Sequence, residues 1–166
     1  MTLDGYLAGK DDDLSFLDGM QLEGEDYGYS DFVDSVDAVI VGRKTYEKVL
    51  DMGYEYPHTD KEVYIITRSP KRAKGSFQYY TGDLSDLIEK LKSEEGKNIY
   101  CDGGAEIVRL MLEKNLIDDI ILSVVPVLLG DGIKLFKEGF SGLSLDLIDS
   151  KSFQTGLVQL HYKCKS

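Results

Sequence analysis

The sequence contains few of the residues that mark disulfide-rich or metal-binding proteins. Among its 166 residues are two cysteines, two histidines, three prolines and no tryptophan. The cysteines, Cys101 and Cys164, lie far apart, which argues against a disulfide framework and fits a reducing compartment. His58 and His161 also stand alone, and zinc needs three or four ligands at suitable spacing, so we expect no metal site. A Cys–His nucleophilic pair stays open, although a buried cysteine is usually a packing residue.

Positive charge and long apolar runs are scarce as well. There are 19 lysines and arginines against 30 aspartates and glutamates, a formal net charge of −11. Such a surface repels phosphate backbones, so we expect neither nucleic acid nor an anionic membrane as a partner. No apolar run reaches the roughly 18 residues of a membrane-spanning helix, and no signal-peptide pattern opens the chain. We therefore expect a cytoplasmic protein with a small-molecule partner.

The sequence does contain enough apolar material for one core. The chain is 42% hydrophobic, and neither an internal repeat nor a linker of Pro, Gly and Ser interrupts it. Its length matches the usual size of one domain, about 100–200 residues. We expect a single domain over residues 1–166.

Strand and helix patterns alternate along most of the chain. Short β-branched or apolar runs predict strands, and apolar residues at helical spacing predict helices between them. The expected strands are 37–42, 62–67, 76–81, 98–102 and 120–129, and the expected helices are 31–36, 45–50, 84–91 and 107–112. Asp83 is the expected N-cap of the helix 84–91. Two further runs, 145–149 and 157–162, have no helix between them and predict an antiparallel hairpin with the connector 150–156. Repeated βα units indicate an α/β fold of three layers (αβα), with a mostly parallel central sheet and an antiparallel C-terminal hairpin.

Ligands of open α/β sheets bind at the carboxyl ends of the strands, and three such ends carry informative residues. Residues 42–45, Gly-Arg-Lys-Thr, lead from a strand into a helix, whose free amide groups suit a phosphate. Arg43 and Lys44 add positive charge, and Thr45 could donate to the same phosphate; a capped helix with two solvated basic residues is the alternative. Residues 67–70 begin Thr-Arg-Ser, whose hydroxyls and guanidinium could bind a second phosphate or form an ordinary loop.

The third strand end, residues 102–105, reads Asp-Gly-Gly-Ala. The paired glycines, Gly103 and Gly104, let the backbone approach a ligand closely, although such turns are also common for structural reasons alone. The spacing is not the G-x-G-x-x-G fingerprint of a Rossmann dinucleotide site. A carboxylate at the end of a buried strand is costly unless it binds a ligand or caps the following helix. Asp102 is therefore a candidate substrate contact or a helix cap.

The order of these motifs is similar to that of a known family. Leu3-Asp4-Gly5-Tyr6 is followed by Gly42-Arg43-Lys44-Thr45-Tyr46, Thr67-Arg68, Asp102-Gly103-Gly104, and a Pro-Val-Leu-Leu-Gly-Asp-Gly run over residues 126–132 with Leu135-Phe136 after it. Over nearly its whole length the chain resembles the dihydrofolate reductase-like superfamily. Within it, the chain looks most like the reductase domain of the bifunctional riboflavin-biosynthesis deaminase-reductase and its stand-alone bacterial relatives.

This resemblance implies a dihydrofolate reductase-like fold with NADPH as the hydride donor. The family's cofactor-binding positions match Ala8, Gly42, Arg43, Lys44, Thr45, Thr67, Arg68, Ser69, Gly103, Gly104, Ala105, Glu106 and Ile107. Asp102 matches an acidic position that contacts substrate in the riboflavin-pathway reductases, and Asp4 is a second candidate in the same pocket. By analogy with the family, the strand 120–129 and the leucine-rich C-terminus could form a homodimer interface; burial within one subunit is the alternative.

The chain departs from the family pattern in three places. Met1 falls inside the usual first strand, and we expect that further residues precede it. The nearby acidic residues Glu23, Glu25 and Asp26 do not align with the acid of dihydrofolate reductase, and residues 56–60 lack its folate-binding arginine. We therefore predict an NADPH-dependent reductase of a small heterocyclic, pyrimidine- or pterin-like substrate, which the two candidate aspartates orient. Authentic dihydrofolate reductase and a non-catalytic nucleotide-binding domain are the alternatives.

Overall fold

The computed structural model describes residues 1–69 and 75–165. The chain forms two compact units. The central unit comprises residues 29–110, and the terminal unit comprises residues 1–28 and 111–166. That the whole chain behaves as one domain stays a prediction. None of the helices in the described part of the chain combines the length and the apolar character needed to cross a bilayer.

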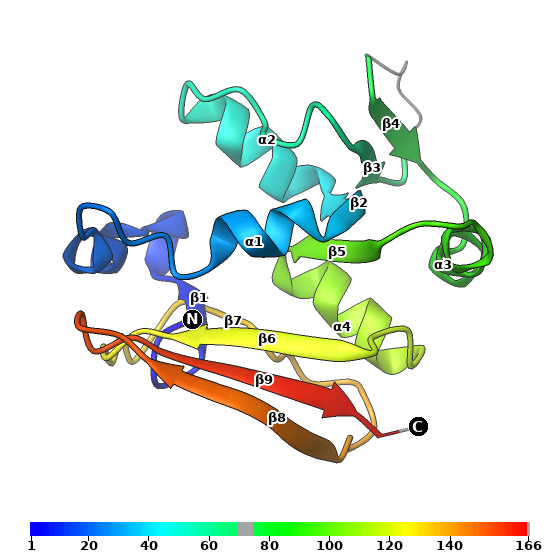
Figure 1. Cartoon of the computed structure of the whole chain (residues 1–166). Coiled ribbons are helices and arrows are strands. Elements are labelled where there is room, and N and C mark those ends of the chain that lie inside the picture. Colours follow the sequence, from blue (N-terminus) through cyan, green and yellow to red (C-terminus); the bar gives the residue numbers. More distant parts are fainter. Residues whose placement is uncertain (70–74, 166) are drawn as a thin grey trace. The chain divides into compact units, whose positions relative to one another are not determined.

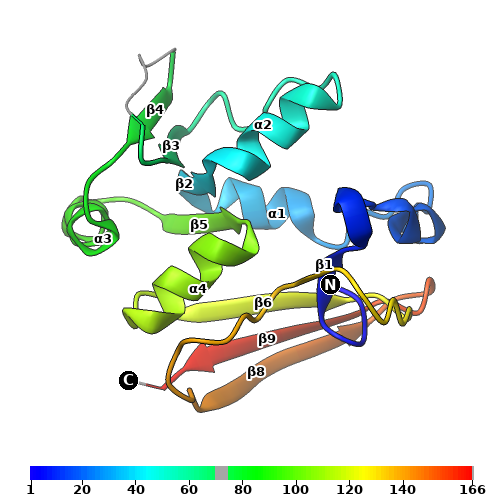
Figure 2. The same ribbon diagram turned by 180° about the vertical axis from the view of Figure 1, so that it is seen from behind.

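The central unit is built on a four-stranded parallel sheet. Its order is β4 (Phe77–Tyr80), β3 (Glu62–Ile66), β2 (Val36–Gly42) and β5 (Asn98–Gly103). In both views β2 lies between β3 and β5 (Figure 1, Figure 2). The helices of this part of the chain are α1 (Tyr29–Asp34), α2 (Arg43–Asp51), α3 (Leu84–Ser93) and α4 (Ala105–Glu113), the last of which continues into the terminal unit. The predicted α/β class and its parallel sheet are confirmed.

The sheet of the central unit is buried because its middle strands are apolar on both faces. Five side chains of β2 and β3 form the centre of one core cluster, together with Tyr46 and Tyr56: Val36, Val39, Val41, Val63 and Ile65. Such near-continuous apolar runs are typical of parallel strands covered on both sides. Asp83 caps α3 as predicted, since its carboxylate accepts a hydrogen bond of 2.7 Å from the amide of Ser85.

The terminal unit contains two antiparallel sheets. Strands β6 (Asp119–Val124), β9 (Val158–Cys164) and β8 (Leu145–Ser152) lie side by side in that order (Figure 1). A short pair joins β1 (Tyr6–Ala8) to β7 (Ile133–Lys134), and two 3-10 helices, η1 (Lys10–Asp12) and η2 (Ser15–Met20), follow β1. The C-terminal hairpin is antiparallel as predicted, and it belongs to a sheet with β6, which pairs with β9 along its full length.

Several predicted boundaries differ from the structure, and three of the differences have a clear physical reason. The strand expected over 120–129 ends at Val124, because Pro126 has no amide hydrogen for a ladder and the chain turns there, with the Val127 amide bonded to the Val125 carbonyl. The hairpin connector is 153–157 rather than 150–156, since β8 continues to Ser152. The helix expected over 31–36 is 29–34, because Val36 already belongs to buried β2.

The first residues of the chain run beside the end of β6. The amino group of Met1 donates to the Ser123 carbonyl at 2.7 Å, and Thr2 forms a parallel bridge with Val125. The Leu3 amide continues this pairing with a hydrogen bond of 3.0 Å to the carbonyl of Val127. The expectation that further residues precede Met1 stays a prediction.

Candidate functional site at the carboxyl edge of the parallel sheet

The three strand ends singled out in the sequence lie along one edge of the parallel sheet. In the sheet register Gly42 lies opposite Ile66 of β3, and Val41 lies opposite Gly103 of β5. The parallel strands therefore bring residues 42–45, 67–69 and 102–107 to the same edge. Pro70, the last residue of the second predicted strand end, lies outside the described residues.

Two of these strand ends pack closely on each other through their glycines. A Cβ atom on Gly104 would lie 2.9 Å from Oγ1 of Thr45, and one on Gly42 would lie 3.0 Å from Cγ1 of Ile107. Gly103 has a φ of +88°, a left-handed backbone that favours glycine, and its peptide bond to Gly104 is cis. The β2–α2 and β5–α4 connections therefore form one continuous backbone surface.

The amino-terminal end of α2 contributes a partial positive charge to this surface. The helix begins at Arg43, two residues earlier than predicted, and its cap is Gly42, which has no side chain to bond the first amides. Its first turn contains no acidic residue, so its partial positive charge is not offset there. Nη1 of Arg43 contacts Oε2 of Glu47 one turn away at 2.5 Å, and the Arg43 side chain stays 40% exposed. Lys44 follows Arg43 in the same first turn.

The other predicted cofactor residues have simpler surroundings. Oγ1 of Thr67 accepts a hydrogen bond of 3.2 Å from the Ser69 amide, which makes a compact turn with Arg68 exposed between them. At the start of α4, Ala105 is buried, and exposed Glu106 accepts a hydrogen bond of 2.8 Å from Arg109. Arg68 therefore adds positive charge, and Glu106 negative charge, to this edge of the parallel sheet.

Asp102 lies at the end of β5, where two tyrosine hydroxyls bond its carboxylate. The hydroxyl of Tyr100 donates to Oδ1 at 2.8 Å, and the hydroxyl of Tyr56 donates to Oδ2. Tyr100 comes two residues before Asp102 on the same strand, so the two side chains share one face of the sheet. Tyr56 arrives from the loop between α2 and β3 and is only 2% exposed. Asp102 itself is half-buried.

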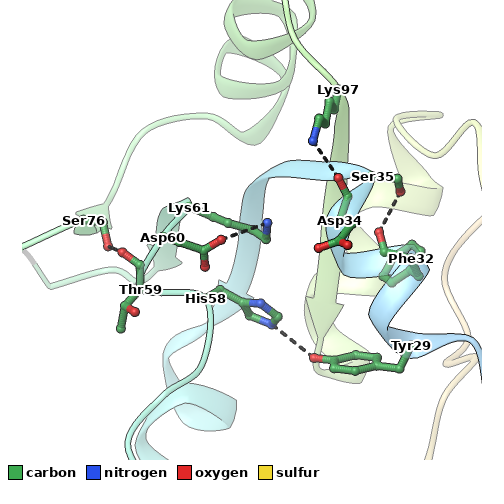
Figure 3. A network of polar contacts seen from close by, with 10 residues as sticks. All are labelled: Tyr29, Phe32, Asp34, Ser35, His58, Thr59, Asp60, Lys61, Ser76 and Lys97. Carbon is green, nitrogen blue, oxygen red and sulfur yellow. Dashed lines mark hydrogen bonds and ion pairs between the residues drawn. The ribbon is translucent and has the colours of Figure 1, made fainter. Parts of the chain in front are cut away.

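A buried histidine completes the surroundings of Asp102. His58 is 8% exposed, and its ring centre lies 6.1 Å from that of Tyr56 and 6.0 Å from that of Tyr100. Its Nε2 lies 3.3 Å from the hydroxyl of Tyr29 on α1 (Figure 3). Burial lowers the pKa of His58 below its usual 6.5, while the negative charge of Asp102 opposes this shift. The sequence alone treated His58 as isolated, and the structure corrects this.

The tyrosines beside Asp102 are held as neutral hydrogen-bond donors. Burial raises the pKa of both Tyr56 and Tyr100 well above the usual 10, and the charge of Asp102 raises it further. Cys101, which lies between Tyr100 and Asp102 on β5, has its pKa raised to about 11, also mainly by burial. This thiol therefore stays protonated near neutral pH, unlike an activated nucleophile. Both cysteines of the chain are free.

Sequence reasoning missed Tyr29, Tyr56, His58 and Tyr100 as members of this site. The alternation of side chains along a strand could have found Tyr100, because Asp102 follows it by two residues. No local pattern indicates that residues 56–58 or Tyr29 reach the same carboxylate, because their positions depend on the packing of a loop and a helix.

The remaining predicted residues, Asp4 and Ala8, belong to the terminal unit. Oδ1 of Asp4 accepts a hydrogen bond of 2.6 Å from Thr2, and Oδ2 accepts one of 2.7 Å from the Gly130 amide. These bonds lower the pKa of Asp4, the Thr2 hydroxyl most of all, and they tie the Leu-Asp-Gly turn to the loop after β6. Asp4 therefore has a structural role; its role with Asp102 in a substrate pocket stays a prediction. Ala8 is buried on β1.

Comparison with known proteins decides the family. The family described as "RibD C-terminal domain" matches residues 1–159. The chain belongs to the RibD C-terminal domain family. This confirms the resemblance drawn from the sequence motifs, all of which lie within the matched range.

Relatives and solved structures support this RibD C-terminal domain assignment. The uncharacterized protein YwjB of Bacillus subtilis (strain 168) is 40% identical over 163 residues, which cover 98% of this chain and 92% of the relative. A putative riboflavin biosynthesis protein from Shewanella sp. PV-4 is 30% identical, with a TM-score of 0.90 over 100% of this chain and 96% of that one.

A more distant structure shows the same fold within a longer protein. The Thermotoga maritima diaminohydroxyphosphoribosylaminopyrimidine deaminase/5-amino-6-(5-phosphoribosylamino)uracil reductase is 14% identical, with a TM-score of 0.73 over 99% of this chain and 54% of that one. The chain thus spans about half of that bifunctional protein. These solved structures share the fold of this chain.

Proposed function

We propose that this protein is an NADPH-dependent reductase that transfers a hydride to a small heterocyclic substrate, pyrimidine- or pterin-like. The observation that carries the proposal is that three strand ends meet at one edge of the parallel sheet. Two of these strand ends carry basic residues, and the third begins with Asp102. A phosphate-binding surface and a polar group for substrate therefore meet within one unit. The family, whose distant relative is titled a deaminase and uracil reductase, supports the same reaction class.

The residues at this edge fit a dinucleotide with an extra phosphate. Gly42 and Gly104 let the two helix starts pack closely, and the uncapped first turn of α2 presents amide donors to an anion. Arg43, Lys44 and Arg68 supply positive charge in a protein whose net charge is −11. When bound, the nicotinamide would supply the hydride, while these groups hold the phosphates and Asp102 orients the substrate.

The first test compares NADPH with NADH, which lacks the 2′-phosphate. Replacing Arg43 or Arg68 by alanine should weaken NADPH binding about tenfold, because a hydrogen bond to a charged group is worth roughly 1.5–3 kcal/mol, while NADH binding changes little. Thermal shift and calorimetry at matched concentrations give both affinities. Lys90→Ala, which removes one exposed positive charge from α3, is the matched control. Equal losses for the two nucleotides, or no binding of either, would contradict the proposal.

A second test separates the reductase from its alternatives. Oxidation of bound NADPH, followed at 340 nm across a panel of pyrimidines, pterins and dihydrofolate, reports turnover directly. Dihydrofolate turnover that methotrexate inhibits would instead identify a dihydrofolate reductase. Tight NADPH binding without oxidation by any member of the panel would favour a non-catalytic nucleotide-binding domain.

A further inference from the structure

Each oxygen of the Asp102 carboxylate has its own tyrosine donor. Tyr100 donates to Oδ1 at 2.8 Å and Tyr56 donates to Oδ2. An ionised carboxylate offers about four acceptor positions on its two oxygens. Two tyrosine bonds therefore leave acceptor capacity on both oxygens, and Asp102 is half-buried rather than fully enclosed. The carboxylate is thus both fixed and able to accept hydrogen bonds from a ligand.

Packing holds both hydroxyls in place. The Tyr56 ring lies 5.2 Å from the ring of Tyr46 and meets Phe77 edge-on at 6.0 Å. The Tyr100 ring meets Phe32 of α1 edge-on at 4.9 Å. Each tyrosine ring therefore packs against an aromatic ring from another element, so neither hydroxyl can move away from Asp102 without disturbing the core.

The two hydroxyls replace the basic partner that a half-buried carboxylate usually has. In the described part of the chain no lysine or arginine forms an ion pair with Asp102. Both hydroxyls donate, so the two bonds fix the carboxylate of Asp102 as a hydrogen-bond acceptor. The electrostatics also agree, since the carboxylate and the burial together keep both tyrosines protonated.

We propose that Tyr56 and Tyr100 are positioning residues of the reductase: they fix both oxygens of Asp102 in place as hydrogen-bond acceptors. Asp102 then binds the substrate by accepting N–H hydrogen bonds from it. The substrate group recognised at this point is accordingly an N–H donor edge of the heterocycle. This inference rests on the proposed function for its consequence in catalysis, but ligand binding at Asp102 can be measured without turnover.

The test removes one hydroxyl at a time and keeps the ring. In Tyr56→Phe and Tyr100→Phe, calorimetry should show that the affinity for a pyrimidine or pterin with a free N–H edge falls about tenfold, because the carboxylate loses one of the two bonds that fix it. The same ligand methylated at that nitrogen should bind wild type and variants alike. Tyr64→Phe is the matched control, since the Tyr64 hydroxyl donates to Glu62 at 2.6 Å at the amino end of β3, away from the site. Unchanged affinities in both variants, or a wild type that binds none of these ligands, would overturn the inference, whether or not the protein reduces a substrate.

The second readout is catalytic. In both variants KM for the substrate should rise about tenfold, while kcat falls no more than about threefold and the NADPH dissociation constant stays within about threefold of wild type. A fall in kcat with an unchanged KM, or an equal loss of NADPH affinity, would refute the positioning role. If no substrate is reduced at all, the proposed function fails, and the ligand affinities still decide whether the tyrosines position Asp102.

Discussion

At the scale of single residues, the proposed chemistry of this protein centres on one carboxylate. Asp102 stands at the end of a parallel strand, with tyrosine hydroxyls on both oxygens and a buried histidine nearby. A polar group in such surroundings loses contact with water, and every bond to it matters more than on the surface. Asp102 leads to a prediction about activity, and His58 leads to a prediction about stability.

Asp102→Asn should remove most of the activity and little of the cofactor binding. The amide keeps the size of the side chain but lacks the charge and one acceptor oxygen, so the substrate loses its orientation. We expect kcat/KM for substrate reduction to fall at least about 100-fold, with the NADPH dissociation constant within about threefold of wild type. Glu62→Gln, which alters the other tyrosine-bonded carboxylate, is the control. A variant as active as wild type would remove Asp102 from the reaction.

His58 should make the folded protein sensitive to mild acid. Its pKa is lowered in the folded state, so between that value and the unfolded value near 6.5 the unfolded chain binds more protons. The contribution is therefore fully present above about pH 6.5 and is lost as the pH falls through the folded pKa. We expect denaturant titrations at pH 8 and pH 5 to show a larger loss of unfolding free energy in wild type than in His58→Asn. Asparagine suits the site because residue 58 has a φ of +68°. Parallel pH curves for the two proteins would contradict this.

At the scale of elements, glycines decide how close the connections come. Gly42 and Gly104 let two strand ends of the central unit pack together, and Gly132 does the same in the terminal unit. A Cβ on Gly132 would lie 2.2 Å from the carbonyl oxygen of Ala8, and the φ of Gly132 is +139°. The pairing of β1 with β7 therefore depends on this glycine.

Gly132→Ala should destabilise the protein strongly. The backbone conformation and the close contact would each cost about 1–3 kcal/mol, so we expect a loss of about 3 kcal/mol or more in unfolding free energy. Gly142→Ala is the matched control, because nothing lies within 4 Å of its Cβ position and its φ is not positive. Chemical denaturation measures both variants. Similar stabilities for the two would show that β1 and β7 adjust freely.

The strands and helices also show which features local sequence patterns can predict. The strands and helices of the central unit were predictable because β-branched runs and helical spacing are local, and Asp83 was recognisable as a cap for the same reason. The end of β6 was missed, because apolar composition continues through residues 125–129 while Pro126 ends the ladder. The carboxyl edge could be predicted, since parallel strands place their ends together. The surroundings of Asp102 could not be predicted in the same way. Tyr56 bonds Asp102 from a loop, and Tyr29 contacts His58 from α1, which is distant in the sequence.

At the scale of the whole molecule, the chain is acidic and leaves several large apolar side chains on its surface. On β8, Leu147 is 56% exposed and Ile148 is 57% exposed, and on β6 Ile121 is 46% exposed. Both strands belong to the C-terminal and 120–129 regions expected to form a homodimer interface. That expectation stays a prediction.

Association can be tested through β8. Leu147→Lys places a charge on the exposed strand and should shift a dimer toward monomer, with a dissociation constant at least about tenfold weaker. Sedimentation equilibrium measures this against the chain mass of 18.6 kDa. Leu50→Lys, at an exposed position on α2, is the control. A wild-type protein that sediments as a monomer at all concentrations would end the homodimer expectation.

The sequence by itself determined the α/β class, the parallel strand ends and the candidate residues on them, because these depend on local periodicity and on the order of motifs along the chain. It also carried the resemblance to the family that the comparison confirmed. Only the tertiary structure decided what surrounds Asp102. Tyr56 reaches that carboxylate from the loop after α2, and His58 of the same loop contacts Tyr29 of α1. Contacts between such distant segments depend on packing that no local pattern encodes.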